Sequence, residues 1–456
     1  MKKLFLLLFF ASISIQAQYK ITGELNPLKD HTWAALYKIE GVNYVFVKSE
    51  TLTKNVKVIN GKKTTVGRFE FTLPKNAKTG TYRVLYKTEG NGFADFLFNK
   101  ENVDFTFNPD KAEESISFSK SKENKLYQEY IKVVSSEQSR TDSLQMAYIK
   151  NPQAKTGSLY KSQLSKIAAL QRQYLGKSKG TMVYHFIKAT NRYNSPILAT
   201  DPQEYLKSVN DHFFDTIDFN NTTLYNSTFI LDRVTDYVFY MNYSEDAVKQ
   251  TELYKKAVSK VLGKAKSPSF KKDLIGFLIT QFVNSQNIDF SDYLMKTYYK
   301  KLPVNLQSKD FIKSFNEKTL VGIGRIAPEI TWNKNGKDYK LSTLNEAQNY
   351  VLVFWSTGCG HCLREIPLLY TYTQNSKNVK VIAFSLENND IDWKRYVQKY
   401  PKWHNVLGLK KWENAIARTY QIYSTPTYII LNKDKKIIAK PETLDEVKKI
   451  VEYLDQ

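Results

Sequence analysis

The chain has 456 residues, which is long for one domain and predicts about two to four. Its 67 Lys and Arg against 45 Asp and Glu give a formal net charge of +22. The lysines are spread along the chain, which argues against the concentrated basic stripe or binding module typical of nucleic-acid recognition. Two cysteines are too few for a scaffold held together by disulfides.

Residues 1–17 have the pattern of a secretory signal peptide. A basic start precedes an apolar run from Leu4 to Ile15, and small residues up to Ala17 indicate a cleavage site. The run is shorter than the ~20 apolar residues of a membrane span, and no later stretch is long enough, so we expect no integral membrane segment in the mature chain. The signal and the many lysines favour the periplasm of a Gram-negative cell.

Residues 18–112 are predicted to form a small antiparallel β domain, a sandwich or barrel. Apolar and polar residues alternate around Phe69 to Leu73 and around Val103 to Phe107, which is the period of a half-buried strand. Asn60-Gly61 and Asn91-Gly92 provide the turn chemistry between such strands.

Residues 113–320 change to the helical period. Asp201-Pro202-Gln203-Glu204 is a helix start, with an N-cap followed by proline at the first helical position. Ile275, Leu278, Ile279 and Phe282 repeat the spacing of one buried helix face. We find no chemistry-bearing motif in this region.

Residues 321–456 alternate strands and helices, as an α/β domain does. Tyr350 to Phe354 and Val379 to Phe384 are predicted buried strands, and Thr427 to Lys440 a closing hairpin. Thr443 with Glu446 is a capping box that begins the last amphipathic helix.

Both cysteines lie in one motif, Cys359-Gly360-His361-Cys362, directly after a predicted strand. At a helix N-terminus, free N–H groups favour the Cys359 thiolate, which would attack a partner's disulfide. Cys362, one turn later, would resolve the mixed disulfide. The alternative, a structural zinc site, needs four ligands, and the remaining histidines are scattered at His31, His185, His212 and His404.

Two further elements accompany the cysteines. His361 either raises the reduction potential by stabilising the thiolate or merely occupies an exposed loop position. Ser424-Thr425-Pro426-Thr427 precedes the hairpin, and a cis Thr425–Pro426 bond would leave backbone groups of Thr425 available to a substrate chain.

Together these motifs resemble the thioredoxin superfamily, and within it the exported TlpA/ResA-like branch. The resemblance covers residues 321–456 and includes Ala327-Pro328-Glu329, Phe354-Trp355-Ser356-Thr357 before the cysteines, Pro367 after them, and Thr425-Pro426-Thr427. The whole chain also resembles, more loosely, Bacteroidetes-type exported proteins with a β domain and a helical region ahead of such a module.

The sequence departs from the family pattern in ways that bear on the site. Gly358 replaces the usual tryptophan before the first cysteine, and Val353 stands where thioredoxin has a buried aspartate. Glu365 matches the acidic residue of the TlpA/ResA-like branch and either accepts the proton that Cys362 loses or is a solvated glutamate paired with Arg364 or a lysine. The Gly-His pair between the cysteines occurs in disulfide isomerases, which leaves the direction of catalysis open.

The sequence therefore predicts a multidomain, exported thiol–disulfide oxidoreductase that acts on other exported proteins. Thr425 and Pro426 would form the substrate-binding loop, with Trp355 packing beneath the site. No cofactor or metal is expected, and the resemblance implies a membrane-bound redox partner. Two alternatives stay open: a redox-gated binding or scaffolding module in which the upstream domains carry the main function, and, more remotely, a thiol peroxidase.

Overall fold

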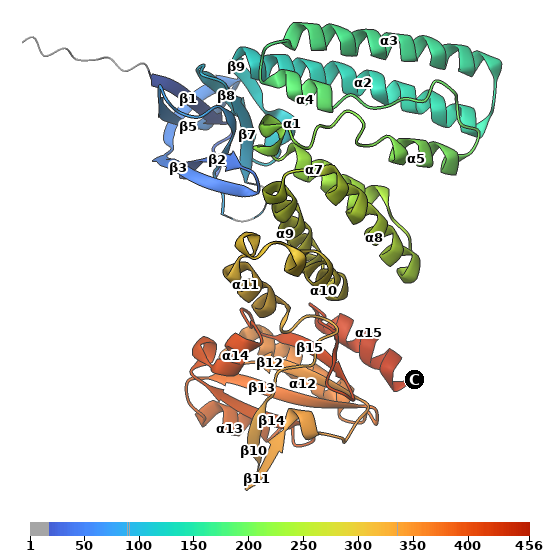
Figure 1. The fold of residues 1–456 in the computed structure, drawn as a ribbon. Coiled ribbons are helices and arrows are strands. Elements are labelled where there is room, and N and C mark those ends of the chain that lie inside the picture. The colour runs from blue at the N-terminus through green and yellow to red at the C-terminus, as the bar shows by residue number, and fades with distance from the viewer. Residues whose placement is uncertain (1–17, 89, 91, 335) are drawn as a thin grey trace, which may run out of the picture. The chain divides into compact units, whose positions relative to one another are not determined.

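The computed structural model describes residues 18–88, 90, 92–334 and 336–456 (Figure 1). The chain divides into two compact units between residues 274 and 275. The predicted signal peptide and Asn91 of one predicted turn lie outside the described residues. The predicted domain boundaries after residues 112 and 320 stay predictions.

The first part of the first unit is β structure in two sheets. One sheet has the strand order β4-β5-β1-β8-β9, and the other has the order β3-β2-β6-β7. The strands are β1 Gln18–Leu25, β2 Trp33–Glu40, β3 Asn43–Thr51, β4 Thr53–Ile59, β5 Lys62–Pro74, β6 Gly80–Leu85, β7 Phe93–Phe98, β8 Val103–Phe107 and β9 Ser117–Lys120.

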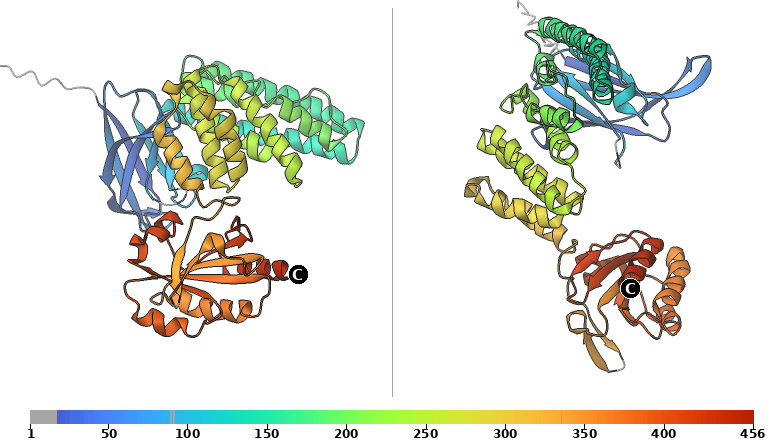
Figure 2. Two further views of the ribbon diagram at one scale, coloured as in Figure 1. Left: turned by 60° about the horizontal axis from the view of Figure 1, so that its bottom comes forward. Right: turned by 90° about the vertical axis from the view of Figure 1, so that its right-hand side faces the viewer.

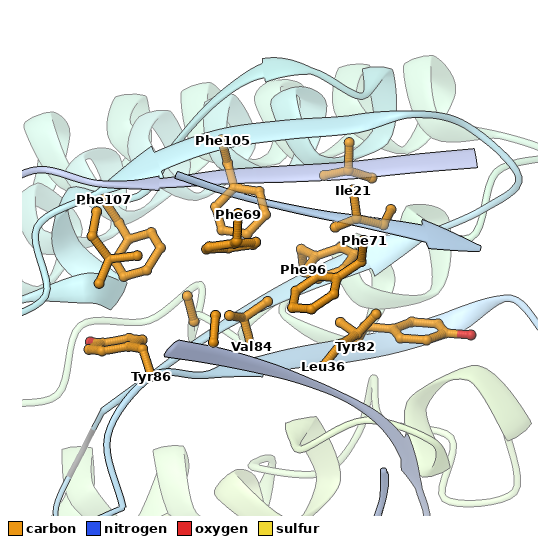
Figure 3. Close-up of a cluster of buried hydrophobic side chains, with 14 of the residues drawn as sticks. Ile21, Leu36, Phe69, Phe71, Tyr82, Val84, Tyr86, Phe96, Phe105 and Phe107 are labelled. Atoms are coloured by element: carbon orange, nitrogen blue, oxygen red, sulfur yellow. The ribbon is translucent and has the colours of Figure 1, made fainter. Parts of the chain in front are cut away.

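Aromatic side chains fill the space between these two sheets (Figure 3). Phe105 of β8 lies 6.0 Å from Phe69 of β5 and 5.5 Å from Phe96 of β7, measured between ring centroids. The alternation seen in the sequence therefore marks the buried face, as expected for a sheet that faces a partner on one side. The antiparallel prediction needs one correction, because β1 and β8 pair in parallel, so the connection between these strands is not a simple hairpin.

The rest of the first unit is helical and continues into the second unit, so the predicted central helical region is confirmed. The helices are α1 Ala112–Ser115, α2 Lys122–Lys150, α3 Ala154–Ser178, α4 Val183–Ala189, α5 Pro202–Asp211, α6 Thr222–Tyr225, α7 Phe229–Thr235, the π-helical segment η1 Asp236–Met241, α8 Ala247–Lys264, α9 Pro268–Asn284, α10 Ile288–Thr297 and α11 Lys309–Thr319, with short 3₁₀ turns η2 Tyr299–Lys301 and η3 Val304–Leu306. The predicted cap of α5 is present, with the Asp201 carboxylate accepting the N–H of Gln203.

The second unit ends in an α/β layer built on one five-stranded sheet of order β14-β13-β12-β15-β16. Its elements are β10 Thr331–Lys334, β11 Lys337–Lys340, η4 Leu341–Thr343, β12 Asn349–Trp355, α12 Gly360–Thr373, β13 Val379–Glu387, α13 Ile391–Val397, β14 His404–Leu409, η5 Lys411–Glu413, α14 Ala415–Thr419, β15 Thr427–Asn432, β16 Ile437–Ala439 and α15 Leu444–Asp455. Strands β12, β13 and β14 are parallel, while β15 and β16 form the predicted closing hairpin.

Each face of this sheet carries its own buried cluster, because the central strand β12 alternates its apolar side chains between both faces. Val351, Val353 and Trp355 pack in the cluster that includes side chains of α12 and α15, whereas Leu352 and Phe354 pack in the cluster that includes Ala417 of α14. Figures 1 and 2 show the backbone of these helices against the sheet. Coverage on both faces makes β12 a rigid strand whose C-terminal end can hold a site.

Among the described residues, no helix combines the length and apolarity that crossing a bilayer requires.

Candidate active site

The cysteine motif follows the most buried strand of the α/β layer. All side chains from Tyr350 to Trp355 in β12 are at or near zero exposure. Cys359 is the N-cap of α12, so the chain turns from strand to helix at the sulfur itself. The structure thus has the predicted order of a strand, a short loop, Cys359 and a helix.

The Cys359 sulfur is held by backbone groups from two directions. Its Sγ accepts the N–H of Cys362 at 3.2 Å, a bond from the free N–H groups of the first helical turn. On its other side Sγ lies 3.3 Å from the carbonyl oxygen of Thr425, to which the thiol donates. Cys359 is partly exposed and therefore open to a partner.

The two thiols have opposite proton affinities. Partial burial disfavours the Cys359 thiolate, but hydrogen bonds from the Cys362 thiol and from the N–H groups of Cys362 and His361 outweigh it and lower the pKa of Cys359. Burial, with the bond to Cys359, raises the pKa of Cys362 to about 12. The accessible sulfur is thus the acidic one, and the inaccessible sulfur, at 0% exposure, keeps its proton.

The loop that precedes β15 lies against Cys359. The Thr425–Pro426 peptide is cis, as the sequence predicts. Thr425, Pro426 and Thr427 are partly exposed beside a sulfur that is itself accessible. A substrate chain that reaches Cys359 would therefore meet this loop.

The His361 ring contacts Arg364 in this arrangement. It is exposed, and its Nδ1 lies 2.9 Å from Nη2 of Arg364. Because a guanidinium only donates, Nδ1 is the acceptor in this contact. The part of His361 that bonds Cys359 is its backbone N–H. The role of its ring as a setter of the reduction potential stays a prediction.

Glu365 is neither free in solvent nor paired with Arg364. Its Oε2 accepts a hydrogen bond from the Tyr428 hydroxyl, with 2.8 Å between the two oxygens. Tyr428 is buried in β15, in the same cluster as Cys362 and Trp355. Burial, the bond to Glu365 and the two nearby thiols raise the pKa of Tyr428, so the phenol stays protonated and donates a hydrogen bond to the carboxylate.

Sequence reasoning missed Tyr428, and it also missed Glu387. Glu387 is buried at the end of β13, where its carboxylate accepts the N–H of Thr357 at 2.6 Å and the Thr357 hydroxyl at 2.9 Å. The Ser385 hydroxyl donates to the same carboxylate at 2.5 Å. These bonds fix the loop that carries Cys359. The sequence signal for Glu387 was an acidic residue at the end of the apolar strand β13, which pairs with β12.

Trp355 lies beneath the site and has no exposed surface. It can therefore support the cysteines but cannot touch a substrate in this arrangement. Gly358, directly before Cys359, is exposed, and a Cβ added there would meet only Ser356 Oγ, at 3.8 Å, apart from the neighbouring residues of the chain. The missing tryptophan at this position leaves one side of Cys359 open.

Metal ligands do not gather near the cysteines. Within the described ranges no group of three or more His, Cys, Asp or Glu side chains could hold an ion. His404 instead bonds the Glu346 carboxylate at 3.0 Å.

A thioredoxin-like family model matches residues 348–437, which contain the cysteines and the cis-proline loop. This part of the chain belongs to the thioredoxin-like family. The thioredoxin-like domain is similar to the thiol-disulfide oxidoreductase ResA of Bacillus cereus, with 28% identity over 143 residues, 31% of this chain and 81% of that protein. ResA of Geobacillus thermodenitrificans is 24% identical over 31% of this chain and 82% of its own length.

Solved structures similar to the thioredoxin-like domain include chains from Cytophaga hutchinsonii and Bacteroides fragilis. A domain of a possible thiol-disulfide isomerase from Cytophaga hutchinsonii is 31% identical over 29% of this chain and 92% of that chain, with a TM-score of 0.26. A thiol-disulfide oxidoreductase from Bacteroides fragilis is 23% identical over 28% of this chain and 100% of that chain, with a TM-score of 0.26. The two ResA proteins are thiol–disulfide oxidoreductases, and together with the family match this supports a redox enzyme role.

Proposed function

We propose that this protein is an exported enzyme that exchanges disulfides with other exported proteins through Cys359 and Cys362. The observation that supports this most is the asymmetry of the pair: Cys359 is accessible with a lowered pKa, and Cys362 is buried with its pKa raised to about 12. An attacking and a resolving thiol need this division of properties.

In the reductive direction, the Cys359 thiolate attacks one sulfur of a substrate disulfide. A bond forms between that sulfur and Cys359 Sγ, and the second substrate sulfur leaves as a thiolate. Cys362 then loses its proton to Glu365 and attacks Cys359 Sγ. The Cys359–Cys362 disulfide forms as the bond between Cys359 Sγ and the substrate sulfur breaks. The two substrate thiolates take up protons from Glu365 and water, so the substrate leaves as a dithiol and two electrons have passed to it. A membrane-bound dithiol partner would return the electrons.

Tyr428 acts in this scheme as a positioning residue for Glu365. Its hydroxyl fixes one carboxylate oxygen on the helix turn that follows Cys362. Glu365 lies one helical turn after Cys362, on the same face of α12. Thr425 and Pro426 would receive the substrate chain beside Cys359.

A trapping experiment tests the roles of the two thiols. The variant Cys362→Ser should accumulate a mixed disulfide with a model disulfide protein, because nothing releases Cys359 from it. The variant Cys359→Ser should form no such species. Mass spectrometry of the trapped adduct identifies the linked cysteine. Trapping through Cys362 in the absence of Cys359 would contradict the assignment.

The direction of electron flow is open and can be measured. A potential of the Cys359–Cys362 couple near ~−180 mV would favour isomerase or oxidase chemistry tuned by His361, and one near ~−270 mV or lower would favour a reductase. Equilibration with glutathione gives this value. Localisation in the periplasm rests on the predicted signal peptide, and fractionation of cells that express the full chain tests it.

A further inference from the structure

Glu387 is a buried acidic residue that the proposed chemistry does not use. It is the last residue of β13 and is only 5% exposed. Burial of a carboxylate is unfavourable unless polar groups replace the water that it loses. Its partners among the described residues are three hydroxyls and one backbone N–H, all of which can donate to it.

Three of these four donors come from the loop between β12 and Cys359. The N–H of Thr357 lies 2.6 Å from Oε1 of Glu387, and the Thr357 hydroxyl lies 2.9 Å from Oε2. The Ser356 hydroxyl lies 3.4 Å from the same Oε2. The fourth donor is the hydroxyl of Ser385 in β13 itself, at 2.5 Å. The end of a buried strand therefore anchors the loop at two successive residues.

The loop needs such an anchor because Cys359 stands between two glycines. Gly358 and Gly360 have no Cβ, so their own sterics restrict the backbone least. Apart from neighbouring chain atoms, the nearest contacts of a Cβ added at these positions would lie at 3.8 and 3.9 Å, so close packing does not hold them either. The restraint on the strand side of Cys359 must come from residues before Gly358.

Ser356, one of the two anchored residues, contacts both cysteines. Its carbonyl oxygen accepts the N–H of Cys359 at 3.2 Å. Burial raises the pKa of the Cys362 thiol to about 12, and a hydrogen bond from the backbone of Ser356 opposes that rise by stabilising the thiolate. Ser356 thus links the Glu387 carboxylate to the positions of both sulfurs.

We propose that Glu387 is a positioning residue for the disulfide exchange between Cys359 and Cys362. Its carboxylate holds Ser356 and Thr357, and this raises the effective concentration of one sulfur at the other. The inference rests on the proposed function, because it concerns the step in which Cys362 Sγ bonds Cys359 Sγ while the bond to the substrate sulfur breaks. A loop without this anchor would place the two sulfurs less well for that step.

Equilibration with glutathione tests this in the chain of residues 18–456. The protein disulfide and two glutathione thiols exchange with the protein dithiol and one glutathione disulfide, so the equilibrium constant measures how readily the two protein sulfurs join. Glu387→Ala removes the acceptor of all four donors. We expect it to shift the equilibrium towards the dithiol on the order of tenfold, because catalytic geometry is sensitive to displacements of about 1 Å.

Glu387→Gln should partly rescue the equilibrium and lie closer to the parent chain. Its single oxygen can still accept the N–H of Thr357, and the hydroxyls can turn to accept from the amide nitrogen. Thr357→Val, at a partly exposed position, removes one of the bonds and keeps the N–H bond. We expect it to shift the equilibrium towards the dithiol by about threefold, within the range that one hydrogen bond contributes.

Glu329→Ala is the matched control for Glu387→Ala. The Glu329 carboxylate also accepts backbone N–H groups and a hydroxyl, but from Ile330 and Ser342 rather than from the cysteine loop. This variant should leave the thiol–disulfide equilibrium unchanged. A shift equal to that of Glu387→Ala would mean that any lost anchor in the domain has the same effect, and it would overturn the proposal.

An equilibrium in folded Glu387→Ala that matches the parent chain would also overturn it, and circular dichroism shows whether the variant is folded. If Glu387→Ala does not fold, an unchanged equilibrium in Thr357→Val would overturn the proposal instead. The proposed function fails separately, if the parent chain itself forms no disulfide between Cys359 and Cys362. A parent that forms this disulfide, with variants that match it, would refute the role of Glu387 alone.

Discussion

At the scale of single residues, the proposed chemistry depends on which of the two thiols loses its proton more readily. Cys359 and Cys362 are three positions apart, yet one sulfur receives hydrogen bonds at a helix N-terminus and the other is enclosed by apolar side chains. The sequence motif sets the spacing, and the fold sets the difference between the two thiols.

The lowered pKa of Cys359 predicts the pH dependence of its reactivity. Because the thiolate is the nucleophile, a lower pKa shifts the midpoint of alkylation below that of an ordinary cysteine, ~8.5, and leaves a larger thiolate fraction at neutral pH. Rates of iodoacetamide reaction between about pH 5 and 10 measure this midpoint. The unfolded chain is the control, and an identical midpoint in both states would contradict the prediction.

Removal of the proton acceptor should slow resolution of the mixed disulfide. We expect Glu365→Gln to lower the resolving rate on the order of 10²-fold, the usual size of general base catalysis. Tyr428→Phe should lower it less and shift its pH profile, since the hydroxyl only positions the carboxylate. Stopped-flow release of a labelled substrate measures both.

Tyr453→Phe is the control for Tyr428→Phe, because Tyr453 is 77% exposed on α15. A purely structural role of Tyr428 would reduce stability without moving the pH profile. That outcome would remove Tyr428 from the mechanism.

Long-range contacts explain which site residues the sequence could not predict. Both cysteines, Pro426 and Glu365 lie in recognisable motifs, whereas Tyr428 meets Glu365 across 63 residues and Glu387 meets Thr357 across 30. Tyrosine at a strand position is an ordinary core residue by pattern. Its partner becomes visible only once β15 lies beside α12.

At the scale of elements, local sequence signals predicted where helices and turns begin better than they predicted which strands pair. The capping residues Asp201 and Thr443 mark helix starts in the structure, and Asn60 and Gly61 both adopt the positive φ of a tight turn. The parallel β1–β8 pair escaped prediction, because the period of a strand does not reveal the direction of its neighbour.

The capping box of α15 is only half formed, which leads to a prediction. The Thr443 hydroxyl accepts the N–H of Glu446, but the Glu446 carboxylate accepts from Glu442. Thr443→Ala should lower the free energy of unfolding by about 1 kcal/mol through loss of the cap. Chemical denaturation measures it.

Thr371→Ala is the control for this change, because its hydroxyl bonds a carbonyl within α12 and caps nothing. It should be close to neutral. Equal losses in the two variants would mean that the cap contributes nothing specific.

At the scale of the whole molecule, the α/β layer is continuous with the helices before it. Arg325 forms a double ion pair with Asp292 of α10 at 2.7 and 2.8 Å, and Gln421 donates to the carbonyl oxygen of Glu317 in α11. Gly322 packs so closely on Ile288 that a Cβ would lie 2.6 Å from it. The unit that begins at residue 275 is therefore larger than the predicted domain at 321–456.

This continuity predicts that a fragment of residues 286–456 is more stable than one of residues 321–456. The Arg325–Asp292 pair is about one-third exposed, so it adds about 1 kcal/mol at most, and burial of Ile288 adds to it. Urea unfolding of the two fragments measures the difference. Asp292→Asn in the longer fragment should remove part of it, and equal stability of both fragments would contradict the prediction.

Because Cys362 is completely buried, the rate of its alkylation reports how often the core around it opens. A reagent that alkylates thiols should add once to each native molecule, at Cys359, because the second sulfur has 0% exposure. A second adduct forms only while the surrounding core is open. The rate of double labelling, divided by that of the unfolded chain, therefore gives the free energy of opening at this one point, without a probe added from outside.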